Sequence, residues 1–586
     1  MSGIIAGGIG EKHRVSKPKS SRTLLGLVLS EAQTGKTRKR LCVLPNDCAL
    51  AAPRHSLSKR CTNSASDRAC WGDYDLSTNY YDEVPDTGVT REYYLELVNT
   101  TAALDGVSRD VLLVNGTFPG PTLFADWGDT VVVKLYNGLT NNGTGLHFHG
   151  IRQNYTNQMD GVPSITQCPT APGESITYTW RATQYGSTWY HSHFALQAWE
   201  GVLGGIIING PASGNYDNDA GVMFLNDWTH KTADAMYTAA ETSGPPTLDN
   251  GLINGTNVYD DAGSRFEMDV TEGESYRIRL VNGAIDTHFK YMIDNHTMTV
   301  IAMDLVPIVP YETTVLSIGM GQRYDIVVNM TETSGDYWIR AIAQTFCSDN
   351  DNANNIKGIL RYDSTSTSDP TTSAYSYDDN CDDESLTDLV PYYALDASSE
   401  STEDDFAVTV GKSNNLFKWY MEAITFNVSW DDPTLLSVYN NDTTFTSQEH
   451  VITLDTADEW VYFVIETTQA VPHPIHLHGH DFFILAQDTG TYSSSTTLSL
   501  TNPPRRDVAM LPASGYLVIA FQTDNPGAWL MHCHIGWHTS EGFALQLVER
   551  YSEIAALIDY DTLNSTCAAW DTYATTNDIE SEDSGV

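Results

Sequence analysis

The segment HCHIGWHTSEGF at residues 532–543 places a cysteine between two histidines, with a third histidine four positions later. Neighbouring residues of a β-strand point to opposite faces, so a strand here would turn Cys533 away from His532 and His534. Thiolate and imidazole groups are common ligands of transition metals. The segment therefore predicts two metal sites that share one strand.

Histidines gather in the same way elsewhere in the chain. Of the 17 histidines, 10 fall in four short groups, and each group contains a His-x-His pair. Residues i and i+2 of a strand point to the same side, so each pair can present two imidazoles to one site. The groups are His147 and His149; His191 and His193; His473, His476 and His478; and His532, His534 and His538. The four pairs supply eight imidazoles, which could hold three metal ions.

Cys533, His473 and His538 would form a separate set of ligands. One thiolate with two imidazoles is the ligand set of a blue-copper electron-transfer centre. A single His-x-His pair is more often structural than a ligand set, and zinc is a common alternative metal. Four pairs, one of which encloses a cysteine, favour copper over both alternatives.

The elements that must position these residues are predicted to be strands. Short alternating or β-branched runs recur between Gly, Pro, Asn and Asp, as in VLLVNGTFPGPTLFADWGDTVVVKLYNGL at 111–139, which is typical of an all-β sandwich protein. A weak repeat is also present. A β run precedes a histidine-bearing segment three times: GDTVVVKLYN before HFHG, GESYRIRLVN before DTHF, and DEWVYFVIET before HPIHLHGH. Three sandwiches of ~150 to 200 residues each would account for residues 61–586.

Charge is distributed unevenly along the chain. The first 60 residues hold 12 of the 32 Lys and Arg but only 3 of the 75 Asp and Glu, which leaves residues 61–586 with a net charge of −52. Such a body would repel nucleic acid and anionic membranes. We interpret residues 1–60, which end in Lys59-Arg60, as a removable leader with a weak signal peptide. No apolar run is long enough to cross a bilayer.

Sequons and cysteines point to the secretory route. Ten Asn-x-Ser/Thr sequons occur in the chain, and seven of the nine cysteines lie outside the leader. If Cys533 is a metal ligand, six cysteines remain, which would suit three disulfides in an oxidising compartment. We therefore expect a secreted, extracellular protein.

Residues 61–586 resemble the multicopper oxidases, specifically the laccases of ascomycete fungi. The motifs that carry the resemblance are HFHGIRQ and MDGVPSITQCP within 147–169, STWYHSHFALQ at 187–197, HPIHLHGHDF at 473–482 and WLMHCHIGWH at 529–538. The resemblance implies three consecutive cupredoxin-like Greek-key β-sandwich domains, at 61–212, 213–395 and 396–570, followed by a tail at 571–586. The second domain would carry no copper ligands.

The resemblance also implies four copper ions per chain. It assigns the ligands as follows: type 1, His473, Cys533 and His538; type 2, His147 and His476; type 3, His149, His191 and His534 on one ion and His193, His478 and His532 on the other. Phe543 would occupy the axial position of the type 1 site, and because it offers no donor atom we expect a raised potential. Core packing alone would also account for Phe543. His480 is not a ligand in the family, and we interpret it as a supporting or structural residue.

The implied activity is that of a laccase, which oxidises phenols or aromatic amines by one electron and reduces O2 to water. His538 would lie at the pocket floor, Asp286 would accept the phenolic proton, and Asp160 would help supply protons near the copper cluster. A solvated loop aspartate and a turn aspartate are the respective alternatives for the two carboxylates. We expect small phenolic or aromatic amine substrates and O2 as the only partners, and a monomer.

Further features follow from the resemblance. It implies disulfides Cys61–Cys70, Cys168–Cys567 and Cys347–Cys381. It also likens the chain end, Asp583 to Val586, to a signal that is trimmed or inserted towards the solvent channel of the cluster; an acidic disordered tail is the alternative. Alternative functions are a specialised phenol-coupling oxidase of pigment or secondary metabolism, a ferroxidase, an ascorbate oxidase, which Phe543 fits poorly, and a copper protein without turnover.

Overall fold

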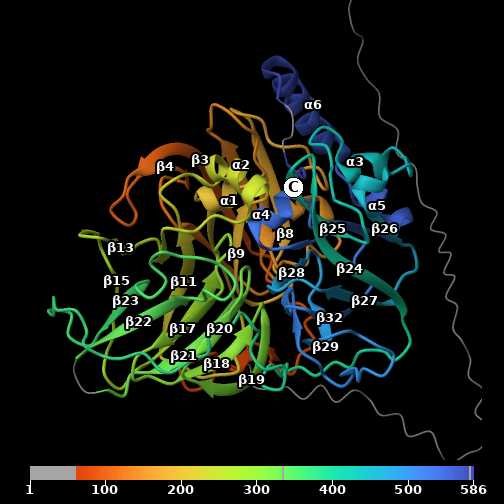
Figure 1. Cartoon of the computed structure of the whole chain (residues 1–586). Helices are drawn as coiled ribbons and strands as arrows, with labels where there is room; N and C mark the ends of the chain where they lie inside the picture. The colour runs from red at the N-terminus through yellow and green to blue at the C-terminus, as the bar shows by residue number, and fades with distance from the viewer. Residues whose placement is uncertain (1–60, 333–334, 580–582) are drawn as a thin grey trace, which may run out of the picture. The chain divides into compact units, whose positions relative to one another are not determined.

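A computed structural model of the chain describes residues 61–332, 335–579 and 583–586, and these are dominated by β-strands (Figure 1). The leader predicted at residues 1–60 lies outside the described residues. Within the described ranges, no helix combines the length and the apolar character needed to cross a bilayer. The strands form three successive pairs of sheets, coloured orange, green and blue along the chain in Figure 1.

The first pair of sheets encloses a single hydrophobic core. One sheet has the order β4 (Arg109–Val114), β3 (Thr90–Ala102), β6 (Thr130–Asn137) and β8 (Ser175–Arg181). The other has the order β5 (Gly120–Asp126), β10 (Leu203–Asn209), β9 (Gly186–Ser192) and β7 (Leu146–His149). Strand β6 alternates as the sequence predicts, with Val131, Val133 and Leu135 buried. These residues pack against Phe148 and its neighbours from the second sheet.

The second pair of sheets repeats this plan with more strands. Its first sheet has the order β12 (Asn250–Ile253), β11 (Asn218–Trp228), β16 (Ser275–Asn282), β21 (Arg323–Asn329), β18 (Met298–Met303) and β19 (Val306–Thr313). Its second has the order β15 (Phe266–Asp269), β23 (Lys357–Arg361), β22 (Asp336–Ala343), β17 (Phe289–Ile293) and β20 (Leu316–Ile318). The disulfide between Cys347 and Cys381 ties the loop after β22 to a later segment, as the resemblance implied.

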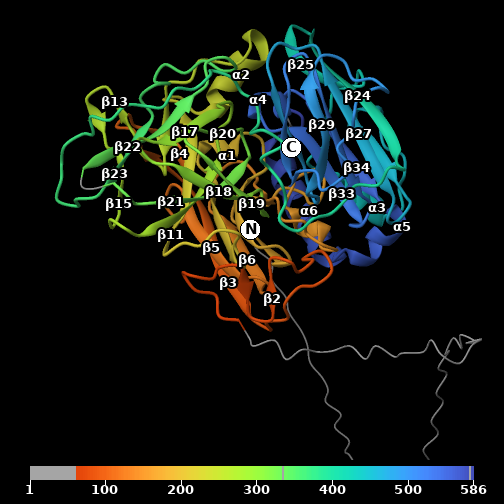
Figure 2. The same ribbon diagram turned by 90° about the horizontal axis from the view of Figure 1, so that it is seen from below.

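The third pair of sheets carries the two C-terminal histidine segments, at 473–480 and 532–538. One sheet has the order β25 (Leu416–Met421), β24 (Thr402–Ser413), β27 (Trp460–Thr467), β32 (Gly515–Gln522), β29 (Phe482–Thr489) and β30 (Arg505–Arg506). The other has the order β26 (Val451–Leu454), β34 (Ala544–Glu549), β33 (Gly527–Cys533), β28 (His473–Leu477) and β31 (Val508–Leu511). Strands β24, β27 and β29 lie on the blue side of Figure 2.

The repeat seen in the sequence corresponds to equivalent strands. The three β runs become β6, β16 and β27, and each pairs in parallel with an earlier strand of its own sandwich, which is β3, β11 or β24. The three histidine-bearing segments overlap β7, β17 and β28. Each of these strands belongs to the other sheet of its sandwich. The threefold repetition of the sandwich is therefore a property of the backbone, as predicted.

Short helices and two small hairpins complete the described chain. The hairpins are β1 (Cys70–Trp71) with β2 (Tyr74–Asp75) and β13 (Val258–Tyr259) with β14 (Ala262–Gly263). The helices are α1 (Gln197–Glu200), α2 (Ala233–Ser243), α3 (Thr434–Tyr439), α4 (Gly536–Ser540), α5 (Tyr551–Ile554) and α6 (Tyr560–Asn577), with 3-10 turns η1 (Asn157–Asp160), η2 (Ser447–Glu449) and η3 (Ala555–Leu557).

Two disulfides fix parts of the chain that lie outside the sandwich strands. Helix α6 is tied to the first sandwich by the disulfide between Cys168 and Cys567, and Cys61 is joined to Cys70 in β1. All three implied disulfides are thus confirmed. Helix α6 also runs across the limit predicted at residue 570, so the segment beyond that limit begins as helix.

Candidate metal centres

Four strands bring the histidine pairs together. In the first sandwich, β7 and β9 pair so that His147 lies opposite His191. In the third, β28 and β33 pair so that His476 lies opposite His532 and Ile475 lies opposite Cys533. Because side chains alternate along each strand, the two pairings place four imidazoles on facing surfaces of two sandwiches.

Cys533 lies with His473 and His538, as predicted. The Cys533 Sγ atom is 4.0 Å from His473 Nδ1 and 3.7 Å from His538 Nδ1, and all three side chains are buried. His538 is on the short helix α4, which directly follows the HCH segment. The Phe543 ring lies 5.3 Å from the His473 ring and stacks on Trp419 at 5.2 Å, so it forms part of the wall around this group.

The other eight histidines form one larger cluster. His193, His478 and His532 have ligand atoms within 4.8 Å of one another, and the same is true of His147, His476 and His478. The rings of His149, His191 and His534 lie 5.1 to 5.7 Å apart. The first and the third of these sets are the two type 3 ligand sets that the resemblance implied. The rings of His147 and His476, the implied type 2 ligands, are 5.8 Å apart.

The electrostatics of both groups suit a bound cation. Burial lowers the pKa of His473 to about 3 and that of His532 to about 4, and burial with neighbouring imidazoles holds the pKa values of His193 and His476 well below their usual range. These rings are therefore neutral and have a lone pair free to bind metal. Burial also raises the pKa of the Cys533 thiol, so its thiolate requires a positive charge beside it.

Several ring nitrogens of the cluster have no hydrogen-bond partner within the described chain. They are His147 Nε2, His193 Nδ1, His476 Nε2 and both nitrogens of His534. Unpaired buried nitrogens are costly unless a ligand occupies them. A thiolate with two imidazoles, joined through one strand to a cluster of imidazoles, fits copper by ligand type.

Three segments of the chain, residues 96–213, 219–365 and 418–553, match models described as multicopper oxidase. Laccase-2 of Botryotinia fuckeliana is 49% identical over 557 residues, which cover 91% of this chain and 95% of that protein. The chain belongs to the multicopper oxidase family. Copper binding follows from membership of this family.

Two further relatives agree with this assignment. Laccase-1 of Botryotinia fuckeliana is 50% identical over 534 residues, which cover 90% of this chain and 94% of that protein. The crystal structure of a laccase from Botrytis aclada superposes with a TM-score of 0.88 at 48% identity, covering 90% of this chain and all of that one. The predicted fold class, all-β with cupredoxin-like Greek-key sandwiches, is confirmed by this likeness.

In this multicopper oxidase, a cavity of about 400 Å³ adjoins the Cys533 group. His538 and Asp286 both line it, so the structure brings together two residues that the sequence placed in one pocket. The Asp227 carboxylate accepts the backbone N–H groups of Ile285 and Asp286, each at 2.9 Å, and Ile285 O accepts the Gly536 N–H at 3.0 Å. These bonds fix the Asp286 loop against the turn that carries His538.

Asp286 is buried, and its environment changes its acidity. Burial, with smaller contributions from Asp227, Glu541 and Asp349, raises the pKa of Asp286 well above its usual range. Burial likewise raises the pKa of Glu541 to about 8, against the opposing effect of Lys418. A carboxylate of raised pKa is a stronger base than an exposed one.

Asp160 contacts two histidines of the cluster. Its Oδ2 lies 2.8 Å from His478 Nδ1, and its backbone oxygen lies 2.9 Å from His147 Nδ1. Asp160 ends the turn η1, and Gly161 follows with φ 78°. A Cβ at Gly161 would lie 1.9 Å from Leu146 O, so only glycine allows this close approach. Asp160 therefore fixes the orientation of the His147 and His478 rings.

The C-terminal residues are packed beside the cluster. Ser584 and Val586 are buried, Ser584 N–H donates to Ser540 O at 3.0 Å, and Ser164 Oγ donates to Gly585 O at 2.7 Å. Val586 lines a small cavity of about 20 Å³ together with His193 and His534. Of the two interpretations of the chain end, the structure has the inserted one rather than a disordered tail.

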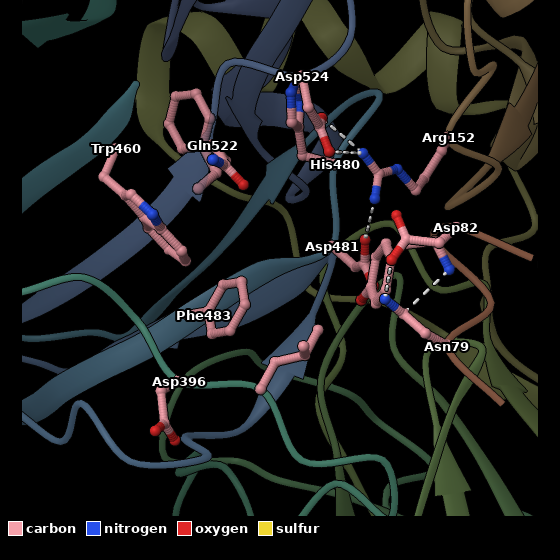
Figure 3. A pocket seen from close by; sticks show the side chains of 13 residues that line it. Asn79, Asp82, Arg152, Asp396, Trp460, His480, Asp481, Phe483, Gln522 and Asp524 are labelled. Carbon is pink, nitrogen blue, oxygen red and sulfur yellow. Dashed lines mark hydrogen bonds and ion pairs between the residues drawn. The ribbon is translucent and has the colours of Figure 1, made fainter. Parts of the chain in front are cut away.

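His480 lies apart from the other histidines, in a different cavity of about 280 Å³ between the first and third sandwiches. Figure 3 shows Arg152 in this cavity, donating to both oxygens of Asp524, at 2.6 and 2.7 Å, and lying 3.5 Å from Asp481. His480 Nε2 lies 3.0 Å from Glu549 Oε2. An ion pair of this kind agrees with a structural role for His480.

Sequence reasoning missed several residues near the metal centres. Asp507 Oδ1 lies 3.1 Å from His149 Nε2, and Asp507 O lies 2.8 Å from His476 Nδ1. The Trp419 ring lies 4.3 Å from that of His538. Asp507 stands in the unusual run Arg505-Arg506-Asp507, which could have marked a buried ion pair, whereas Trp419 carries no motif.

Proposed function

We propose that this multicopper oxidase is a secreted, monomeric laccase, which oxidises phenols or aromatic amines and reduces O2 to water. The observation that carries the proposal is the direct covalent link between two different ligand groups. Cys533 belongs to the group beside the 400 Å³ cavity, while its neighbours His532 and His534 belong to the histidine cluster. An electron delivered at the cavity has a short covalent path to the cluster.

We assign the copper ligands as the family resemblance implies, with four ions per chain. His473, Cys533 and His538 would hold type 1 copper, His147 and His476 type 2, and the two remaining sets of three histidines the type 3 pair. When bound, four coppers supply one-electron redox chemistry and can together store the four electrons that reduce O2 to two waters. We also propose domain limits at 61–212, 213–395 and 396–570, since each range contains one matched segment to within a few residues, although helix α6 continues past the last limit to Asn577.

The chain's own residues prepare the donor for oxidation. The apolar wall formed by Phe417, Trp419 and Pro472 would hold the aromatic ring next to His538. Asp286 would accept the phenolic proton, because a phenol that loses its proton is far easier to oxidise. At the cluster, Asp160 would keep the His147 and His478 rings in place and lies where it could pass protons towards nascent water.

Oxygen uptake by the copper-loaded protein tests this proposal, with a visible spectrum on the same sample. We expect a blue absorbance near ~600 nm and O2 consumption driven by phenolic donors, with water as the product. Ascorbate and ferrous ion serve as comparison donors. A blue protein that consumes no O2 with any donor would contradict the proposed activity while leaving the Cys533 site intact.

A further inference from the structure

Three carboxyl groups line the cavity beside His538, and they come from separate parts of the chain. Asp286 lies between β16 and β17, Asp349 in the loop after β22, and Glu541 directly after α4. Glu541 and Asp349 both contribute to the raised pKa of Asp286, so the three groups interact. The loop that bears Asp349 is anchored by the disulfide of Cys347, which also lines the cavity.

No lysine or arginine is among the described residues that line this cavity. Two lysines lie near its wall. Lys412 donates to Thr242 O at 2.8 Å, and its Nζ lies 4.1 Å from the centroid of the Phe417 ring. Lys418 acts on Glu541 and lowers the pKa of that carboxyl group. An anionic group inside the cavity would therefore find carboxyl groups on its walls and, among the described lining residues, no lysine or arginine.

The remaining wall suits an aromatic ring. Phe417, Trp419, Val471 and Pro472 form an apolar surface, and Phe346 is 54% exposed beside it. A flat donor can pack on these side chains while its substituents reach the carboxyl groups. A cationic substituent would gain attraction from each ionised carboxylate, and it would favour ionisation of any that are protonated in the empty cavity.

We infer that this cavity selects its aromatic donors by charge, favouring those with a cationic substituent over otherwise similar anionic ones. Asp349 and Glu541 are the residues that set this preference. The inference rests on the proposed laccase function and deepens it by naming a substrate class. The strongly acidic body, with a net charge of −52 over residues 61–586, acts in the same direction at longer range.

A matched pair of catechols tests this selectivity. The donors are 4-(2-aminoethyl)benzene-1,2-diol, which carries an ammonium group, and 3-(3,4-dihydroxyphenyl)propanoate, which carries a carboxylate on a chain of similar length. With the copper-loaded protein at low salt and pH 8, where Glu541 is substantially ionised, we expect kcat/KM to be at least about tenfold higher for the ammonium donor. The ratio should fall towards one at high salt, because ions screen the interaction. Equal values at low salt would overturn the inference.

Variants identify the residues responsible. Asp349→Asn, Glu541→Gln and the double variant should each reduce the ratio between the two donors, with the double variant closest to one. Glu400→Gln serves as the matched control, since Glu400 is exposed and does not line the cavity. A ratio unchanged in the double variant would show that these residues do not set the preference. Asp349 is exposed, so its replacement by asparagine removes charge without disturbing a core.

A binding measurement separates this inference from the proposed function. Equilibrium dialysis of the copper-loaded protein would compare 2-phenylethylammonium with 3-phenylpropanoate, which lack the catechol hydroxyls. Stronger binding of the ammonium compound, lost in the double variant, would support charge selection even if no donor drove O2 uptake. Rapid oxidation of both catechols at equal efficiency, with equal binding of the two probes, would uphold the laccase function and overturn charge selection.

Discussion

Replacing Asp286 by asparagine tests the proposed role of its carboxylate in proton transfer. The change removes the base but keeps the size of the side chain. It should also keep the loop in place, because the bonds that fix the loop run from the Ile285 and Asp286 N–H groups to Asp227 and do not use the Asp286 side chain. Any loss of activity can then be attributed to the missing carboxylate.

The magnitude follows from the acidity of the two partners. A phenol ionises near pH ~10 and an exposed aspartic acid near ~3.9, so proton transfer between them is unfavourable by about 8 kcal/mol. Each unit by which burial raises the pKa of Asp286 reduces this gap by about 1.4 kcal/mol. General-base catalysis typically contributes ~10²- to 10⁴-fold. We expect Asp286→Asn to lower kcat/KM for phenols by about 10²-fold or more.

The assay compares a phenol with a donor that loses no proton. Steady-state O2 uptake is measured with 2,6-dimethoxyphenol and with N,N,N′,N′-tetramethyl-1,4-phenylenediamine, for which we expect less than about a threefold change. Asp286 acts as a base only when ionised, so phenol oxidation by the parent protein should rise with pH through its raised pKa, and the variant should lose that rise. Equal losses on both donors, at normal copper content and blue absorbance, would refute the reasoning.

Three other predictions address the metal centres and the pocket. Phe543→Met should lower the type 1 potential, because a thioether near the Cys533 group supplies a donor that phenylalanine lacks, and a redox titration that gave an unchanged or higher potential would contradict the axial assignment. Cys533→Ser should abolish the blue absorbance and reduce copper from about four to about three ions per chain by elemental analysis, since the eight-histidine cluster is retained; four ions in a colourless protein would contradict the ligand assignment. Glu541→Gln should make stability less dependent on pH. The folded-state pKa of Glu541 is raised to about 8, so its contribution is fully present below the unfolded value near ~4.3 and is lost as pH rises towards 8. The melting temperature of the variant relative to the parent should therefore increase between pH 5 and pH 8, and a constant difference would argue against a raised pKa.

Periodicity and motif spacing were sufficient for the local parts of the site. A strand alternates with a period of two whatever it packs against, so the sequence HCH alone separates Cys533 from His532 and His534. The confirmed disulfides and the cupredoxin-like Greek-key form of the sandwiches followed from the resemblance, since the motifs extend over most of the chain. The position of Asp286 on the same cavity as His538 was inferred in the same way.

Contacts between distant segments were not accessible to that reasoning. Alternation tells which face of a strand a residue occupies but not which element covers that face. Asp507 carries no ligand motif, and it reaches His149 only because the first and third sandwiches pack together. The cavity beside His538 is assembled in the same way. It is lined by Trp419, Asp349 and Glu541 together only because the second and third sandwiches pack against one another.

The sequence by itself therefore determined the ligand types, their pairing along strands and the repeated sandwich, because these depend on short-range spacing. The tertiary structure decided which pairs face one another, since the histidine cluster is assembled from β7 and β9 of one sandwich and β28 and β33 of another. It also decided that Val586 is buried beside His193 and His534, a choice that the acidic composition of the C-terminal residues left open. Such long-range contacts depend on the packing of whole sheets, which no local pattern specifies.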